Sequence, residues 1–153
     1  MDKKQLSEID ICEKFISPAI ARAGWNIHDQ IFREYPLRVG RVTVRGNKSH
    51  RDQSTVLRAD YALFYKSNIP IAVVEAKDNN KPMGAGMAQA INYADLLGVP
   101  FSFASNGDGF VFRDATLAKE KPPSSLTPKR FAEGGRVGNS LPNSLKIFLK
   151  PVL

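Results

Sequence analysis

Three ionisable residues beside two apolar stretches are the first candidates for chemistry. Asp60 lies in the first stretch, residues 59–65. Glu75 and Lys77 lie at the end of the second stretch, residues 69–76, and just after it. Mg²⁺ typically takes one or two protein carboxylates and leaves its other positions to water and phosphate oxygens. Such an ion polarises a phosphodiester and activates water, and a nearby lysine can orient that water or offset transition-state charge. Asp60 and Glu75 are therefore candidate Mg²⁺ ligands, and Lys77 is a candidate catalytic residue.

The hairpin expected from these stretches would bring the two carboxylates together. A two-residue turn at Ser67-Asn68 fixes a register in which Asp60 lies opposite Glu75, with Cβ atoms roughly 5 Å apart. Lys77 shares that face because side chains alternate along a strand. Two carboxylates this close repel each other unless a cation lies between them. A turn one residue longer would break the register.

The same three residues have a simpler interpretation. Asp60 could end a strand at the surface, and Glu75 and Lys77 could form a solvated edge. On the motif alone this second interpretation is favoured, because an aspartate followed by Glu-x-Lys is a weak signal.

A helix is predicted over Met83–Leu97, with Gly98 as its terminator. Gln89 and Tyr93 are four residues apart and lie on one face, beside the apolar stripe. An ordinary amphipathic boundary is the alternative interpretation of this pair. Residues 84–86 are Gly-Ala-Gly, but no Gly-Lys-Ser/Thr follows, so no P-loop or ATP site is expected in this chain.

The other elements follow from periodicity and turn residues. A helix capped by Ser7 and Asp10 should run to Gly24, with Cys12 in its apolar stripe and a kink or break at Pro18. Extended segments are expected at 25–35, 37–45, 99–105 and 110–113, and a polar loop at 47–55. These elements form a predicted domain over 1–114, followed by a basic, weakly structured tail over 115–153.

Composition bounds the class of protein. The 153 residues suit one core, the single cysteine allows no intramolecular disulfide, and no apolar run reaches about 18 residues. We therefore expect a cytoplasmic protein without a membrane segment. The net charge is +7, and residues 33–58 and 115–153 each hold seven Lys or Arg against two acidic residues. Such stripes are typical of polyanion binding, although a solvated arginine-rich hairpin would look the same.

The chain resembles the PD-(D/E)XK nucleases, and more narrowly the N-terminal nuclease domain of the restriction (R) subunit of type I restriction-modification enzymes. The resemblance implies an α/β/α sandwich around a mixed sheet and Mg²⁺-dependent cleavage of duplex DNA. It covers residues 7 to about 114 and rests on "SEIDICEKFISPAIARAGW", "REYPLRVGRVTVRGN", "RADYALFYKSNIPIAVVEAKDNN" and "GAGMAQAINYADLLGVPFSFASNGDGFVF".

The resemblance also implies roles for individual residues and favours the catalytic interpretation of the motif. The metal-binding aspartate of the family falls on Asp60, and the Glu-x-Lys pair falls on Glu75 and Lys77. Its Gln-x-x-x-Tyr pair, implicated in nuclease function and DNA contact, falls on Gln89 and Tyr93. An acidic residue of the first helix often completes such sites, and Glu8 is the candidate here, with Glu13 as the alternative.

The sequence departs from the family beyond the nuclease region. Family members continue into two ATP-driven helicase domains, whereas here a basic tail follows, as in a fragment or a truncated product. Translocation, and dependence on the methylation and specificity subunits, are therefore no part of the function expected for this chain. Two hypotheses remain, an endonuclease module and a non-catalytic DNA-binding remnant of a truncated restriction subunit.

Overall fold

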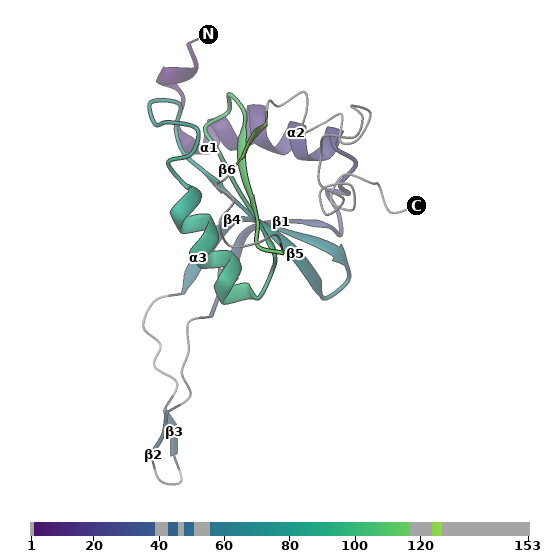
Figure 1. Ribbon diagram of the computed structural model, residues 1–153, viewed down its shortest axis with the longest axis vertical. Coiled ribbons are helices and arrows are strands. Elements are labelled where there is room, and N and C mark those ends of the chain that lie inside the picture. Colours follow the sequence, from purple (N-terminus) through teal and green to yellow (C-terminus); the bar gives the residue numbers. More distant parts are fainter. Residues whose placement is uncertain (1, 39–42, 46–47, 51–55, 117–123, 127–153) are drawn as a thin grey trace.

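A computed structural model of the chain describes residues 2–38, 43–45, 48–50, 56–116 and 124–126 (Figure 1). The N-terminal helical elements are η1 (Lys3–Gln5), α1 (Glu8–Ile11), η2 (Cys12–Ile16) and α2 (Ser17–Arg22), and the later helix is α3 (Met87–Leu97). The strands are β1 (Ile31–Leu37), β2 (Thr43–Arg45), β3 (Lys48–His50), β4 (Leu57–Lys66), β5 (Ile69–Ala76), β6 (Phe101–Ser105), β7 (Phe110–Asp114) and β8 (Ser124–Leu126).

A six-stranded sheet forms the middle layer of the molecule. Its order is β1-β4-β5-β6-β7-β8, and only the β5–β6 pair is parallel, so the sheet is mixed. Helices α1 and α2 cover one face through an apolar cluster that includes Ile16, Tyr61 and Phe103. Helix α3 covers the other face through clusters that include Val73 and Ala90 (Figure 1). The predicted α/β/α sandwich is confirmed.

The first helix begins and breaks for local reasons. Ser7 and Asp10 form the predicted capping box, in which each side chain accepts a hydrogen bond from the other residue's backbone N–H. The helix widens to a π-turn at η2, where the N–H of Ser17 donates to the carbonyl of Cys12. This turn immediately precedes Pro18, whose ring would clash with a carbonyl of a regular α-helix. Cys12 is buried in the core, as predicted.

The hairpin of β4 and β5 has the predicted register near its open end. Tyr61 lies opposite Val74, and Ala62 lies opposite Val73. The turn has the predicted two residues, and Asn68 adopts a positive φ of 61°. The ladder is irregular near the turn, between Leu63 and Lys66, without changing the register farther along.

The segment after the first helix differs from the prediction. Residues 27–30 form a turn, because the side chain of Asn26 accepts the N–H of His28 and its carbonyl accepts the N–H of Gln30. Extended structure therefore begins only at Ile31. Within the predicted 37–45 strand, Leu37 ends β1, residues 39–42 lie outside the described residues, and β2 forms the end.

The predicted loop at 47–55 is wrong for three of its residues. Lys48–His50 form β3, which pairs antiparallel with β2 in a second, two-stranded sheet. Residues 47 and 51–55 lie outside the described part of the chain. Figure 1 draws this hairpin apart from the six-stranded sheet. A hairpin that does not pack on the core needs no alternation of apolar and polar residues, so its sequence resembles that of a loop.

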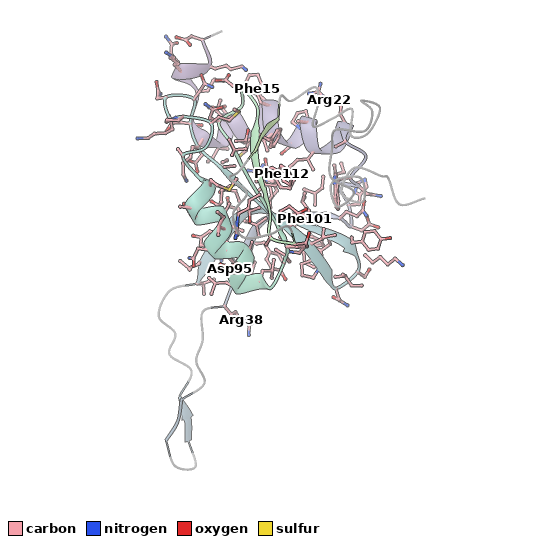
Figure 2. The ribbon with its side chains drawn as sticks, viewed as in Figure 1. Phe15, Arg22, Arg38, Asp95, Phe101 and Phe112 are labelled. Atoms are coloured by element: carbon pink, nitrogen blue, oxygen red, sulfur yellow. The ribbon has the colours of Figure 1, made fainter. Side chains whose placement is uncertain are left out.

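Helix α3 is shorter than predicted at its start. Residues 84–86 form turns, and the first helical residue is Met87, because two glycines there disfavour regular helix. Gly98 ends the helix in a left-handed conformation with φ 72°, as predicted. Figure 2 shows Phe101 and Phe112 in the middle of the molecule and Asp95 on the outside of α3.

The sheet extends past the predicted domain boundary at residue 114. Strand β8 pairs antiparallel with β7, from Phe110 opposite Leu126 to Phe112 opposite Ser124. The predicted tail otherwise lies outside the described residues from 117 to 123 and from 127 onward. Across the residues that are described, no helix has the length and apolarity needed to cross a bilayer.

Candidate functional site

Asp60 and Glu75 meet where β4 and β5 lie side by side. The N–H of Asp60 donates to Oε1 of Glu75 at 3.2 Å, and the N–H of Ala76 donates to Oδ2 of Asp60 at 2.7 Å. Each carboxylate therefore accepts an amide of the opposite strand. These two bonds leave one further oxygen on each side chain, so the pair presents oxygen ligands from both strands.

Burial makes the charge of this pair expensive. Glu75 is 1% exposed, which makes it the most buried charged residue among those described. Burial first, and the neighbouring Asp60 carboxylate second, raise the pKa of Glu75 from 4.5 to about 9. In the absence of a cation, the folded protein therefore holds a proton on this pair at neutral pH.

Lys77 lies next to the pair and contacts the first helix. Its backbone N–H donates to the carbonyl of Ser105 at 2.9 Å, which fixes the chain just beyond β5. Its Nζ lies 3.9 Å from Oε2 of Glu8. Burial raises the pKa of Glu8, Lys77 opposes this shift, and Asp60 adds to it, so these charges share one neighbourhood. Glu13 is exposed. Of the two first-helix candidates, Glu8 is the one placed beside Lys77.

Glu34 is a neighbour that the sequence did not indicate. It is a non-glycine residue with a positive φ of 50°. In the pairing of β1 with β4, Arg33 lies opposite Tyr61 and Tyr35 lies opposite Ala59. Glu34 lies between these two pairs, beside Asp60. The guanidinium of Arg58 donates to the carbonyl of Glu34 at 3.2 Å. Strained backbone of this kind gathers near functional sites, but no motif marks it in a sequence.

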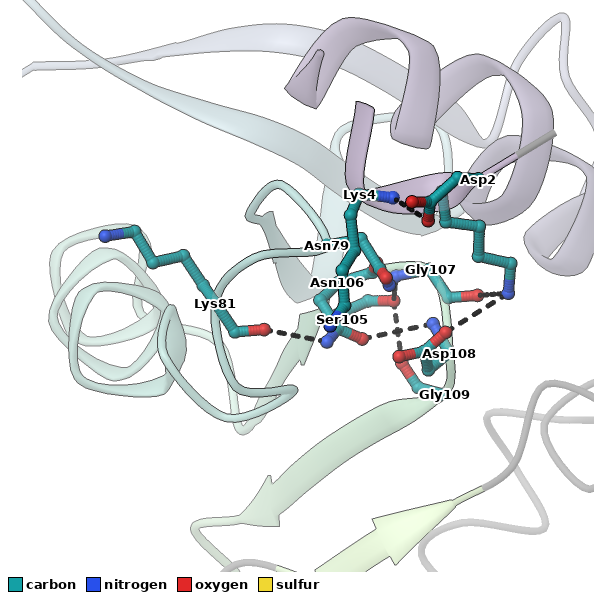
Figure 3. A network of polar contacts seen from close by, with 10 residues as sticks. Asp2, Lys4, Asn79, Lys81, Ser105, Asn106, Gly107, Asp108 and Gly109 are labelled. Atoms are coloured by element: carbon teal, nitrogen blue, oxygen red, sulfur yellow. Dashed lines mark hydrogen bonds and ion pairs between the residues drawn. The ribbon is translucent and has the colours of Figure 1, made fainter. Parts of the chain in front are cut away.

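A polar network holds the loop that follows Lys77 (Figure 3). Asn79 donates to the carbonyl of Asn106 at 2.9 Å, and the Asn106 side chain donates to the carbonyl of Lys81 at 2.8 Å. Lys3 contacts the same turn through Gly107 and Asp108, each at 3.2 Å. Asn106 is 5% exposed, so its bonds are shielded from water. Sequence reasoning identified 106–109 only as a turn; the missed signal is an asparagine directly after a fully buried strand.

Gln89 and Tyr93 lie together on α3. The prediction that Tyr93 lies beside the apolar stripe is wrong. It is 7% exposed and packs in the core with Leu37, Ala59 and Val73. Its hydroxyl accepts a hydrogen bond from Nε2 of Gln89 at 2.9 Å. A tyrosine can bury its ring and still form a hydrogen bond through its hydroxyl. The spacing of apolar residues alone could not distinguish a buried tyrosine from one at the edge of the apolar face. Among the described residues, no hydrogen bond or ion pair joins this pair to Asp60 or Glu75.

The carboxylate pair fits a hard divalent cation that needs few protein ligands. In the described part of the chain, no three or more His, Cys, Asp or Glu side chains are grouped as metal ligands. An ion would therefore rest on Asp60 and Glu75, with water and phosphate oxygens in its other positions, as Mg²⁺ accepts. The observation that favours such an ion is the contact of the buried Glu75 carboxylate with the half-buried Asp60 carboxylate, which repels it when both are ionised.

Comparison with known proteins gives consistent matches. Residues 41–121 match the family described as type I restriction enzyme R protein N terminus. The chain is 51% identical over 119 residues to the type I restriction enzyme EcoAI endonuclease subunit of Escherichia coli, a match that covers 78% of this chain and 14% of that protein.

A solved structure is similar as well. It is a fragment described as an HsdR subunit of a type I restriction enzyme from Vibrio vulnificus YJ016, with 36% identity and a TM-score of 0.64. The match covers 84% of this chain and 25% of that one. The chain thus spans a small part of the length of both relatives.

Proposed function

Because the chain belongs to the family described as type I restriction enzyme R protein N terminus, we propose that it is a Mg²⁺-dependent endonuclease module. It hydrolyses phosphodiester bonds of duplex DNA. The observation that carries the proposal is the cross-strand contact of Asp60 with Glu75, with Lys77 next along the chain. A buried glutamate in contact with a half-buried aspartate, with a lysine nearby, is costly to fold, and a hydrolytic site explains this arrangement.

The metal belongs at the carboxylate pair. Mg²⁺ bound there would polarise the scissile phosphodiester and lower the pKa of the attacking water. Asp60 and Glu75 would hold the ion through the oxygens that their two backbone bonds leave available. Both backbone bonds tie the carboxylates to the strands, so the ligands are held in position before DNA arrives.

Lys77 and Glu8 act beside the metal. The ammonium of Lys77 would orient the attacking water and offset negative charge on the phosphate in the transition state. Glu8, whose Oε2 lies 3.9 Å from that ammonium, would help to hold it in position. In the reaction, the water gives up one proton to solvent as its oxygen forms a bond to phosphorus. The bond between phosphorus and the leaving deoxyribose oxygen breaks, and that oxygen takes up a proton from solvent.

The DNA contact is mainly electrostatic. Residues 33–58 carry seven Lys or Arg against two acidic residues, and Arg33, Arg38 and Arg58 are exposed. Such a surface neutralises phosphates without reading bases. In an assembled type I restriction enzyme, the module would act together with the methylation and specificity subunits.

Plasmid nicking tests this proposal. The wild-type chain should nick supercoiled DNA in Mg²⁺ but not in EDTA, and Lys77→Ala should lose about 10²-fold or more of the rate while still folding and binding Mg²⁺. Equal cutting by both proteins would refute the mechanism. If both bind DNA and neither cuts at any Mg²⁺ concentration, the chain is a DNA-binding remnant instead.

A further inference from the structure

Gly86, at the start of α3, has a backbone conformation that does not require glycine. The reason for a glycine here is the space that a side chain would occupy. It is the N-cap residue, with φ −84° and ψ −1°, a bridge-region conformation that residues with a side chain also adopt in turns. The residue is buried. The backbone angles would permit alanine, so a buried glycine at this position indicates that other atoms approach it closely.

The atoms that approach Gly86 belong to the two motif residues of β5. A Cβ added at position 86 would lie 3.2 Å from the Cβ of Glu75 and 3.6 Å from Cγ of Lys77. The first distance is tighter than ordinary packing, so one of the two elements would have to shift by a few tenths of an ångström. Glu75 has little freedom to do so, because its side chain is 1% exposed and accepts the N–H of Asp60.

We propose that Gly86 is a positioning residue for the nuclease site. It lets the start of α3 lie directly against Glu75 and Lys77, and so sets the distance between β5 and the helix that carries Gln89 and Tyr93. An added methyl group moves the Glu75 carboxylate and the Lys77 stem away from their working geometry. This inference rests on the proposed function, since the site that Gly86 shapes is the proposed nuclease site.

Gly84 provides a matched control two residues away. A Cβ added there would meet only Cγ2 of Val111 at 3.5 Å, an ordinary contact. Neither glycine has a positive φ. Both substitutions to alanine therefore restrict the unfolded chain alike, and they differ in what the new methyl group touches.

The first test measures plasmid cleavage by the full chain as wild type, Gly84→Ala, Gly86→Ala and Lys77→Ala. Gly86→Ala should lower kcat by about tenfold or more while KM for DNA stays within about twofold. Gly84→Ala should cut like the wild type. Wild-type kcat in folded Gly86→Ala, or an equal loss in both glycine variants, overturns the inference. A wild type that does not cut, with Lys77→Ala equally silent, refutes the proposed function instead.

A second test needs no cleavage and holds even if Gly86→Ala folds poorly. The loss of Tm caused by Gly86→Ala is measured in EDTA in the wild type and in a Glu75→Gly background, which lacks the Cβ that the new methyl group would meet. The loss should fall by roughly half or more in the second background, because contacting residues are not additive. An equal loss in both backgrounds shows that Gly86 does not act on Glu75 and overturns the inference.

Discussion

The carboxylates of Asp60 and Glu75 each accept a backbone amide from the other's strand, at 3.2 Å for Oε1 of Glu75 and 2.7 Å for Oδ2 of Asp60. The same two groups that repel each other when ionised thus also join β4 to β5. Their protonation is therefore coupled to the stability of the fold, and a bound cation competes with the proton.

Stability without metal should fall as pH rises. The unfolded carboxyl of Glu75 titrates near 4.5, and in the folded protein its pKa is raised to about 9. Between these values the folded state holds a proton that the unfolded state has lost, so the free energy of unfolding decreases with pH. The contribution is fully present below 4.5 and is lost as pH approaches 9. Urea unfolding in EDTA across this range measures it.

Glu75→Gln is the control for this pH dependence. The amide oxygen still accepts the N–H of Asp60 but carries no charge, so the pH dependence in this window should flatten. At pH 8 in EDTA the variant should be more stable than the wild type by about 1 kcal/mol or more, roughly 2–4 °C in Tm for a chain of this size. Stabilisation by Mg²⁺ should disappear with the ligand. A variant as pH-dependent as the wild type would show that another group titrates.

Gln89→Ala and Tyr93→Phe should act as one unit in cleavage. The Tyr93 ring fills the core and Phe preserves it, so the fold should lose only about 1 kcal/mol from the lost hydrogen bond. Each variant should reduce kcat/KM and leave stabilisation by Mg²⁺ unchanged, and the double variant should lose no more than either alone. Asn92→Ala, exposed on the same helix, is the control. Additive losses would show that the two side chains act independently.

The backbone at Glu34 should be relieved by glycine. An L-residue at φ 50° bears a steric cost that glycine avoids, so Glu34→Gly should be more stable than Glu34→Ala by about 1 kcal/mol. The comparison with alanine removes any effect of the lost carboxylate, and the bond from Arg58 goes to the carbonyl and survives both changes. Chemical denaturation of both variants gives the difference. An alanine variant at least as stable as the glycine variant would argue against strain at this position.

The hairpin that carries Asp60 and Glu75 could be predicted because a two-residue turn and strict alternation determine its register, and that register appears near the site. The capped first helix and Gly98 have equally local signals. The burial of Tyr93, the strain at Glu34 and the close approach at Gly86 depend on how separate elements pack. No window of the sequence contains those contacts, so single-sequence reasoning could not reach them.

The last prediction concerns DNA affinity and its dependence on salt. If residues 33–58 and 115–153 both neutralise phosphates, log K for duplex DNA should fall steeply with log salt, by about 0.9 per phosphate contact. Replacing Arg38 and Arg45 with Gln, or Lys129 and Arg130 with Gln, should flatten the slope by up to about 1.8 for each pair. Arg22→Gln is the control, since Arg22 is exposed and lies far from Arg38 in Figure 2. Fluorescence anisotropy with a labelled duplex measures the slopes. Unchanged slopes in both pairs, or no binding by the wild type at low salt, would show that these basic stretches are solvated surface without a role in holding DNA.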